Sequence, residues 1–355
     1  MSTLRIAFWI LALCAAVAST GADARIVRVG PDGDSPTIAG AARIAQDGDT
    51  VEIAAGVYAG DVTVWLQRKL TIRAPKGQAT LLASGKNAEG KAIWVIRQGD
   101  FIVENLEFRG ARVPDGNGAG IRLERGKLEV RNCRFTDNQN GILTGNDSQT
   151  ELSIHHSFFS SAPRQERPPP HLLYAGQIAE LNVTDSHFES GHTGHMIKSR
   201  ARKSTLVRNT INDGPQGHAS YELDFPNGGQ VLVSGNVIGQ SAHSANPVML
   251  AYGAEGRHWP ENRLLVEGNT FYSEGWRPLW AVRVWDQTFG GRLNVQVLNN
   301  LIAGYGILYW GNTHEAAGNR LVPPFMLANP SANDFRIPAD SMLRKLWEKV
   351  PGALP

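Results

Sequence analysis

The sequence predicts an all-β fold, a single-stranded right-handed parallel β-helix in which the chain winds into stacked coils. Two observations lead to this prediction. A short motif, an apolar residue followed by bend residues and then by an aromatic residue or Ile, recurs at intervals of 23 to 33 residues. The chain also contains 38 glycines among its 355 residues, which suits a backbone that turns every few residues.

The motif is explicit from VENLEF onward, and Asn is common at its bend. Asn suits this position because it tolerates the left-handed backbone conformation. Stacked asparagines at equivalent bends can also hydrogen-bond to one another. The leucine-rich pattern of other solenoids with this period is absent, so a β-helix is favoured. The eight copies end at Phe108, Phe135, Phe159, Phe188, Ile211, Ile238, Phe271 and Ile302.

Residues 1–24 have the features of a secretory signal peptide. Arg5 supplies the positive charge, Ile6 to Ala18 form a short apolar core, and cleavage is expected near Ala24/Arg25. We therefore expect a periplasmic or extracellular protein with no stable membrane insertion after cleavage, because the apolar run is too short for a confident span. The mature chain keeps Cys133 alone, which excludes a disulfide framework, and we expect this thiol to be buried and inert.

Residues 25–355 are expected to form one β-helix domain that is closed at both ends. An apolar stripe at helical spacing in TIAGAARIAQ predicts a capping helix at about residues 36–46. Such a helix would cover the apolar core and the unpaired strand edges at the open end. The helix followed by GDTVEIAAGVY resembles the N-terminal cap of pectate-lyase-like β-helix proteins. The tail, about 325–355, resembles a closing segment, with a short helix from about Ser341.

Longer intervals between copies of the motif predict three surface loops. The first is the proline-rich Pro163–His171, which cannot form a central strand. The second is GAEGRHWPEN at residues 253–262, and the third is SEGWRPLW at residues 273–280. We expect all three to lie over one face. If the protein is an enzyme, the Pro163–His171 and Glu255–Asn262 loops should wall a groove there.

Alternation along the strands predicts which side chains point outward. If Leu173, Ile197 and Leu223 point inward, an outward column of Tyr174, Lys198 and Glu222 follows, at spacings of 24 and 24 residues. A second outward column two residues on would contain Gly176, Arg200 and Asp224. The next coil would contribute Met249 and Ala251 to the two columns, and the coil after it Arg283 and Trp285. This register places the most reactive side chains of the chain on one face.

The segment MIKSRARKSTLVRNTI, followed one coil later by YELDFPNGGQVLVSGNVIG, resembles the chondroitinase B and alginate lyase family of β-helix enzymes over Gly191–Gln240. In that family a lysine abstracts the C5 proton of a uronic acid, an arginine on the next rung assists, and calcium neutralises the carboxylate. Lys198-Ser199 matches the lysine-serine pair, whereas Asp224 stands where the family has its arginine. The resemblance implies an acidic polysaccharide as partner and calcium as a candidate cofactor, although no clear set of calcium carboxylates is visible.

Elimination across C4–C5 of a uronic acid needs a base for the C5 proton, a cation for the developing enolate and an acid for the leaving oxygen. We assign Lys198 as base or enolate-stabilising group, Tyr174 as proton donor and Glu222 as orienting partner. Arg200 and Arg202 would clamp the carboxylate. His192 and His195 are alternative bases. The remaining candidates for substrate binding are Tyr221, Asp224, Glu255, Arg257, Trp259 and Arg283.

Several alternatives stay open from the sequence. A C5-epimerase would use the same proton abstraction, and a glycoside hydrolase would use paired carboxylates such as Glu222 with Asp224 or Glu255. A glycan-binding or surface-structural β-helix would instead carry these charges as cross-strand ion pairs on a solvated face. The net charge of +2 argues against a nucleic-acid partner. No metal ligands are assigned, because His192 and His195 lack a third ligand at diagnostic spacing. A monomer is expected.

Overall fold

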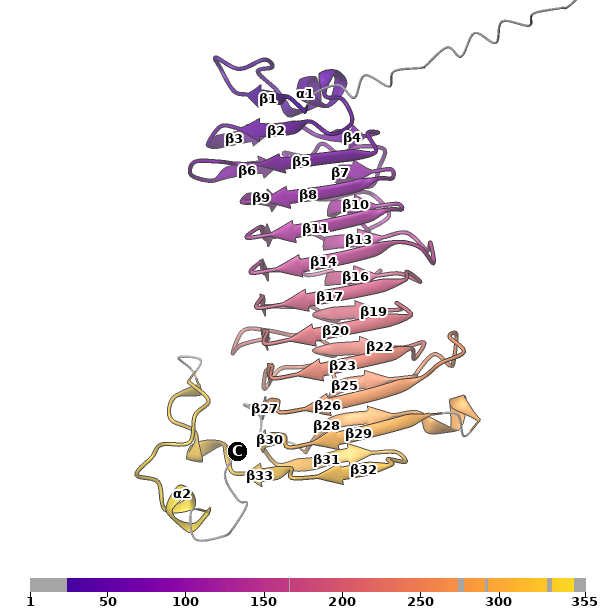
Figure 1. Ribbon diagram of the computed structural model, residues 1–355. Coiled ribbons are helices and arrows are strands. Elements are labelled where there is room, and N and C mark those ends of the chain that lie inside the picture. The colour runs from indigo at the N-terminus through magenta and orange to yellow at the C-terminus, as the bar shows by residue number, and fades with distance from the viewer. Residues whose placement is uncertain (1–23, 166, 274–277, 291–292, 331–333, 348–355) are drawn as a thin grey trace, which may run out of the picture.

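A computed structural model describes residues 24–165, 167–273, 278–290, 293–330 and 334–347. The predicted signal core therefore lies outside the described residues, as do residues 274–277 of the third predicted loop. The chain is a right-handed parallel β-helix, with its coils stacked along one axis (Figure 1). In the described ranges, no helix has the length and apolar character needed to traverse a bilayer.

Three parallel sheets, of twelve, ten and eleven strands in the described part of the chain, run along this axis. The first contains β1 (Ile26–Val29), β2 (Thr50–Ile53), β5 (Lys69–Arg73), β8 (Asp100–Glu104), β11 (Lys127–Arg131), β14 (Glu151–His155), β17 (Glu180–Thr184), β20 (Lys203–Val207), β23 (Gln230–Ser234), β26 (Arg263–Glu267), β29 (Asn294–Leu298) and β32 (Glu315–Ala317).

The second sheet carries the predicted column. It contains β4 (Thr63–Trp65), β7 (Ala92–Ile96), β10 (Ala119–Leu123), β13 (Asn140–Thr144), β16 (His171–Ala175), β19 (Ile197–Ser199), β22 (Leu223–Phe225), β25 (Val248–Tyr252), β28 (Leu279–Val284) and β31 (Gly306–Trp310). The third contains β3 (Gly56–Ala59), β6 (Ala79–Leu82), β9 (Leu106–Arg109), β12 (Arg134–Thr136), β15 (Phe158–Ser160), β18 (His187–Glu189), β21 (Thr210–Asn212), β24 (Val237–Gln240), β27 (Thr270–Ser273), β30 (Leu301–Ala303) and β33 (Arg320–Val322).

Helix α1 (Ile38–Ile44) lies across the N-terminal end of the solenoid (Figure 1). The Thr37 hydroxyl caps it by accepting from the backbone N–H of Gly40 at 3.0 Å. The Asp61 carboxylate, from the next coil, accepts from the backbone N–H groups of Ile38 and Ala39 at 2.5 and 2.9 Å. Ile38 and Ala41, the residues on the inner face of this helix, are fully buried. Helix α1 thus covers the first coil, and the hydrogen bonds to Asp61 attach the helix to the next coil.

Three further short helices lie toward the C-terminus. They are η1 (Asp286–Phe289), η2 (Pro324–Met326) and α2 (Met342–Trp347). Helix α2 begins one residue after Ser341 and lies toward the C-terminal end of the molecule (Figure 1).

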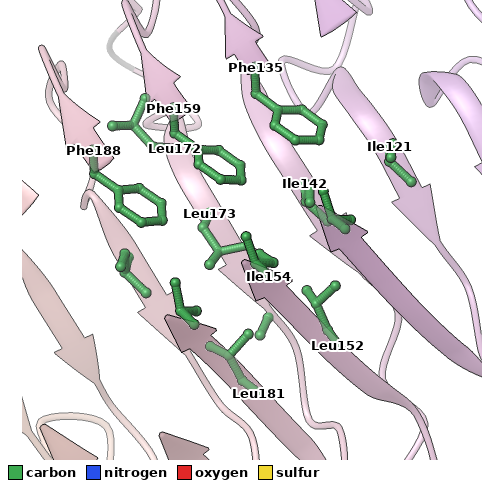
Figure 2. Packing of buried hydrophobic residues seen from close by; sticks show 14 of the residues in the cluster. Ile121, Phe135, Ile142, Leu152, Ile154, Phe159, Leu172, Leu173, Leu181 and Phe188 are labelled. Atoms are coloured by element: carbon green, nitrogen blue, oxygen red, sulfur yellow. The ribbon is translucent and has the colours of Figure 1, made fainter. Parts of the chain in front are cut away.

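The core of the solenoid is a stack of inward-facing apolar side chains. The rings of Phe108, Phe135, Phe159 and Phe188 stack with centroid separations of 5.1, 4.6 and 4.6 Å. Figure 2 shows three of these rings beside the aliphatic side chains of the other two sheets. The separations match the distance between hydrogen-bonded strands, so each coil adds one ring to the stack. The end residues of the sequence motif are therefore the core of the fold.

The bend residues of the motif form a ladder of side-chain amides, as the sequence predicts. The Asn236 side chain accepts from the backbone N–H of Asn209 at 2.8 Å and donates to the Asn269 side chain at 3.0 Å. Asn300 and Asn319 continue the ladder. In earlier coils Ser157 occupies the equivalent place and accepts from the backbone N–H of Cys133 at 3.2 Å. Burial raises the pKa of the Cys133 thiol to about 12, so this cysteine is inert.

Candidate active site

The outward column on the second sheet is set by the pairing of its strands. Leu173, Ile197 and Leu223 align in one inward column, which confirms the register assumed from the sequence. The outward neighbour of Tyr174 is Lys198, also as predicted. The next member of the column is Asp224. Ala251 and Arg283 follow in the two later coils.

The predicted position of Glu222 is wrong. The coil that follows Lys198 is two residues longer than the coil that leads from Tyr174 to Lys198. Asp224, and not Glu222, therefore pairs with Lys198. The predicted second column of Gly176, Arg200 and Asp224 fails for the same reason. Glu222 is fully buried, and its Oε2 accepts from Nε2 of Gln240 at 3.3 Å. Asp224 therefore takes the place beside Lys198 that the sequence analysis gave to Glu222.

Lys198 lies at the centre of the site. Its side chain is 11% exposed, and its Nζ lies 3.5 Å from Oδ2 of Asp224 and 3.2 Å from Oε1 of Glu255. The same Nζ lies 5.6 Å from the centroid of the Tyr174 ring. Glu255 comes from the loop at residues 253–262, so strand pairing does not determine its position. One amine thus joins two carboxylates and a phenol ring.

Arg200 connects the same groups from a neighbouring position. Its Nε donates to the Tyr174 hydroxyl oxygen at 2.8 Å, and its Nη2 lies 2.6 Å from Oε2 of Glu255. Its Nη1 donates to the side-chain oxygen of Asn227, a residue that the sequence analysis did not select. The indole of Trp259 is buried and donates to the backbone oxygen of Arg200 at 3.0 Å. Trp259 therefore anchors the loop and offers no exposed ring for a sugar.

Two histidines support the acidic member of the column. Nε2 of His195 lies 3.3 Å from Oδ2 of Asp224, and the His195 ring stacks on Tyr221 at 4.8 Å. The backbone N–H of His195 donates to Nδ1 of His171 at 2.9 Å. Burial, with the nearby charge of Lys198, lowers the pKa of His171 to about 3, and burial holds the pKa of His195 well below its usual value. Both imidazoles are therefore neutral at pH 7.

His171 was missed by the sequence analysis, although a signal for it exists. It precedes His195 by 24 residues, the same interval that separates Tyr174 from Lys198. A search for chemically active residues one coil apart would have found this pair.

The pKa values of the two carboxylates at Lys198 are shifted in opposite directions. Burial raises the pKa of Asp224 to about 6, and the charge of Glu255 adds to this, although Lys198 acts against it. Burial also raises the pKa of Glu255, but the hydrogen bond from Arg200 and the charge of Lys198 outweigh it and hold that pKa below its usual value. Asp224 is thus the carboxyl whose charge changes nearest to neutral pH.

Other predicted residues lie apart from this cluster. His192 stacks on His218 at 5.1 Å on the turns that precede the sheet. Arg202 is exposed, and its charge adds to the hydrogen bond from Lys203 that lowers the pKa of Glu180 on the first sheet. Arg257 is exposed on the loop. Arg283, two coils beyond Asp224, lies over the rings of Trp280, Trp285 and Trp310 at 4.9, 4.3 and 5.4 Å.

The described residues do not fit a calcium ion at this site. No group of three or more His, Cys, Asp or Glu side chains within them is placed to share a metal. The two carboxylates nearest the centre are already in ion pairs with Lys198 and Arg200. No step of the reaction below is therefore assigned to calcium.

The chain was compared with protein families, with curated proteins and with solved structures. No protein-family model matches this chain, and no curated protein matches its sequence. The solved structure of the PL6 family alginate lyase AlyGC matches with a TM-score of 0.55 and 16% identity, over 79% of this chain and 40% of that one. An alginate lyase from Paenibacillus sp. str. FPU-7 matches with a TM-score of 0.50 and 13% identity, over 82% and 99%.

These likenesses show the fold. The chain is a right-handed parallel β-helix that resembles those of polysaccharide lyases. It spans about 40% of the length of AlyGC.

Proposed function

We propose that the protein is a periplasmic or extracellular enzyme that cleaves an acidic, uronic-acid polysaccharide by β-elimination. The observation that carries this proposal is the position of the Glu255 carboxylate. It is bound by both Lys198 and Arg200, next to the Tyr174 hydroxyl that Arg200 also contacts. The protein thus presents two cations and a phenol to one carboxylate, which is the arrangement that a uronate would need.

Glu255 is well placed to give way to a substrate. Its side chain is 48% exposed, and its loop contains Gly253 and Gly256, both with positive φ angles. A uronate carboxylate has the same charge and geometry, so it can replace that of Glu255 on Lys198 and Arg200. Lys198 and Arg200 each give the carboxylate one charge-assisted hydrogen bond, which favours such a ligand.

The bound uronate would then lie between the groups that the elimination needs. Lys198 passes its ammonium proton to the neighbouring Asp224 carboxylate, and the neutral amine then takes the C5 proton. The C5–H electron pair forms the C4–C5 double bond as the C4–O bond breaks. Arg200 stabilises the negative charge that develops on the carboxylate. Because Tyr174 accepts a hydrogen bond from Arg200, its own proton points elsewhere and can be given to the leaving oxygen. Asp224, held by His195, positions Lys198.

The proposal is tested by incubating the purified protein with a panel of uronic-acid polysaccharides and following the ultraviolet absorbance of the unsaturated uronate product. A neutral polysaccharide serves as the control. We expect absorbance to rise with at least one acidic member and not with the neutral one. Binding of an acidic member without any unsaturated product would contradict elimination.

The raised pKa of Asp224 and the lowered pKa of Glu255 favour a second candidate, a glycoside hydrolase. Two carboxyl groups whose environments push their pKa values apart can serve as acid and base. A hydrolase would release reducing ends without the unsaturated product. A C5-epimerase would change the configuration at C5 without shortening the chain, and a binding protein would do neither.

The acidity of Asp224 predicts a pH dependence. We expect kcat/KM to fall as the pH is lowered through about 6, because protonation of Asp224 removes the charge that holds Lys198 and His195. His171 and His195 are already neutral there, and Glu255 ionises below its usual range, so these groups do not produce the fall. Rate profiles of the wild type and of Asp224→Asn check this. An acidic limb that keeps its position in the variant would assign the limb to another group.

This loss of activity is separable from unfolding. The pKa of Asp224 rises from 3.8 to about 6 on folding, so its contribution to stability is fully present below pH 3.8 and is lost as the pH rises to about 6. Acidification through pH 6 therefore increases the stability contributed by Asp224 while it removes activity.

A further inference from the structure

A pocket of about 350 Å³ opens on the second sheet, on the N-terminal side of the candidate active site. Tyr174 forms part of its wall, so the pocket is continuous with the reaction centre. Its lining also includes Lys91, Asp115, Asn117, Arg122, Leu143 and Asn146. None of these residues has a role in the chemistry described above.

Arg122 belongs to the same outward column as Lys198. Arg122 pairs with Leu143, Leu143 pairs with Tyr174, and Tyr174 pairs with Lys198. Three steps of strand spacing, about 4.8 Å each, separate the two cations by roughly 14 Å along the axis. A polysaccharide chain that lies along the column would therefore pass over both.

The guanidinium of Arg122 has hydrogen-bonding capacity that the described residues do not use. Its Nε is buried and has no hydrogen-bond partner among them. Its ion pair there is with Oε2 of Glu124 at 3.4 Å, while the other oxygen of Glu124 binds Lys91 at 2.6 Å. A buried donor without an acceptor destabilises the protein. The Arg122 side chain as a whole is 24% exposed, so a ligand carboxylate can reach the guanidinium fork from the pocket.

The remaining lining suits a sugar ring. Leu143, between Arg122 and Tyr174 in the column, gives an apolar floor for the C–H face of a ring. The Asn146 side-chain oxygen accepts from the backbone N–H of Gln177 at 2.9 Å, which leaves its NH₂ group to face a ligand hydroxyl. Asn117 adds a second amide. Lys91 and Arg122 bring two cations to the lining beside the carboxylate of Asp115, and both cations also pair with Glu124.

We propose that this pocket binds a second acidic sugar of the same polysaccharide chain, with its carboxylate on Arg122. The proposal rests on the proposed function, because it takes an acidic polysaccharide as the ligand. It implies that a saccharide long enough to bridge about 14 Å binds more tightly than one that fills the reaction centre alone.

The test measures both binding and turnover for Arg122→Gln and Arg122→Lys. All calorimetric titrations are made in a Lys198→Ala background, with Arg122 intact or replaced by Gln or Lys. The ligands are a long uronic-acid oligosaccharide, a short one, and a long one whose carboxyl groups have been reduced. We expect Arg122→Gln to weaken binding of the long acidic oligosaccharide about tenfold and to leave the short one unchanged. Arg122→Lys should have an intermediate effect. In active protein, KM for the long substrate should rise while kcat stays constant.

Arg131→Gln, on the first sheet, is the matched control, and thermal unfolding checks that each variant folds. Equal affinity of wild type and Arg122→Gln for the long acidic oligosaccharide would overturn the inference, even if elimination is observed. A tenfold loss of affinity in a protein that forms no unsaturated product would uphold the pocket and refute the lyase. Equal binding of the acidic and carboxyl-reduced oligosaccharides would also overturn it, because Arg122 would then not hold a carboxylate.

Discussion

Lys198→Ala is expected to lower the rate of unsaturated product formation by about 10²- to 10⁴-fold, the range typical for loss of a general acid or base. Lys198 is the one side chain in the described site that contacts both Asp224 and Glu255 and lies over Tyr174. Removing it takes away the base and leaves the two carboxylates facing each other. Initial rates on the polysaccharide identified in the panel measure the effect.

Lys203→Ala is the matched control for this variant. Lys203 is an exposed lysine five residues away on the first sheet, where it pairs with Glu180 at 2.8 Å. It should keep the wild-type rate. Thermal unfolding establishes that Lys198→Ala is folded, and Lys198→Gln keeps most of the side-chain volume if the alanine variant does not fold. Wild-type kcat in a folded Lys198 variant would remove this residue from the mechanism.

The largest loss of stability is expected for Phe159→Ala, about 3–5 kcal/mol in the free energy of unfolding. Phe159 is fully buried and stacks on Phe135 and Phe188, each at 4.6 Å. Truncation would open a cavity in the ring stack that the neighbouring coils cannot refill. Chemical denaturation measures the loss.

Phe158→Ala is a control on the same strand. Phe158 points outward, where its ring stacks on His187 at 5.3 Å and lies under the Arg134 guanidinium at 4.1 Å. These contacts are partly exposed, so the loss should be about 1 kcal/mol. Equal losses for the two variants would contradict the inward register of the third sheet.

The fold could be predicted from the sequence because the residues that end each copy of the repeat motif are also the residues of the core. Each motif ends in a side chain that must be buried, so its recurrence indicates the coils and, through Asn, the bends. The inward column of Leu173, Ile197 and Leu223 was predictable for this reason.

The site was only half predictable, and the reason is physical. Alternation gives Tyr174 and Lys198, but the longer turn before β22 moves Asp224 into the place expected for Glu222. Counting residues cannot tell whether extra residues enter a turn or a strand. Glu255 lies 57 residues from Lys198 on a loop, where no strand pairing sets its register. The contacts that define the chemistry therefore depend on loop packing, which periodicity does not encode.

Helix α1 has a consequence for how the molecule behaves in solution. The first strands of the three sheets, β1, β3 and β4, form the end of each ladder, and α1 packs against β1 and β4. A bare end of this kind is a template on which the last coil of a second molecule could continue the hydrogen-bond ladder. Repeated head to tail, that contact never closes on itself and grows into fibres. Because α1 covers the ladder ends at β1 and β4, we expect it to oppose this end-to-end growth.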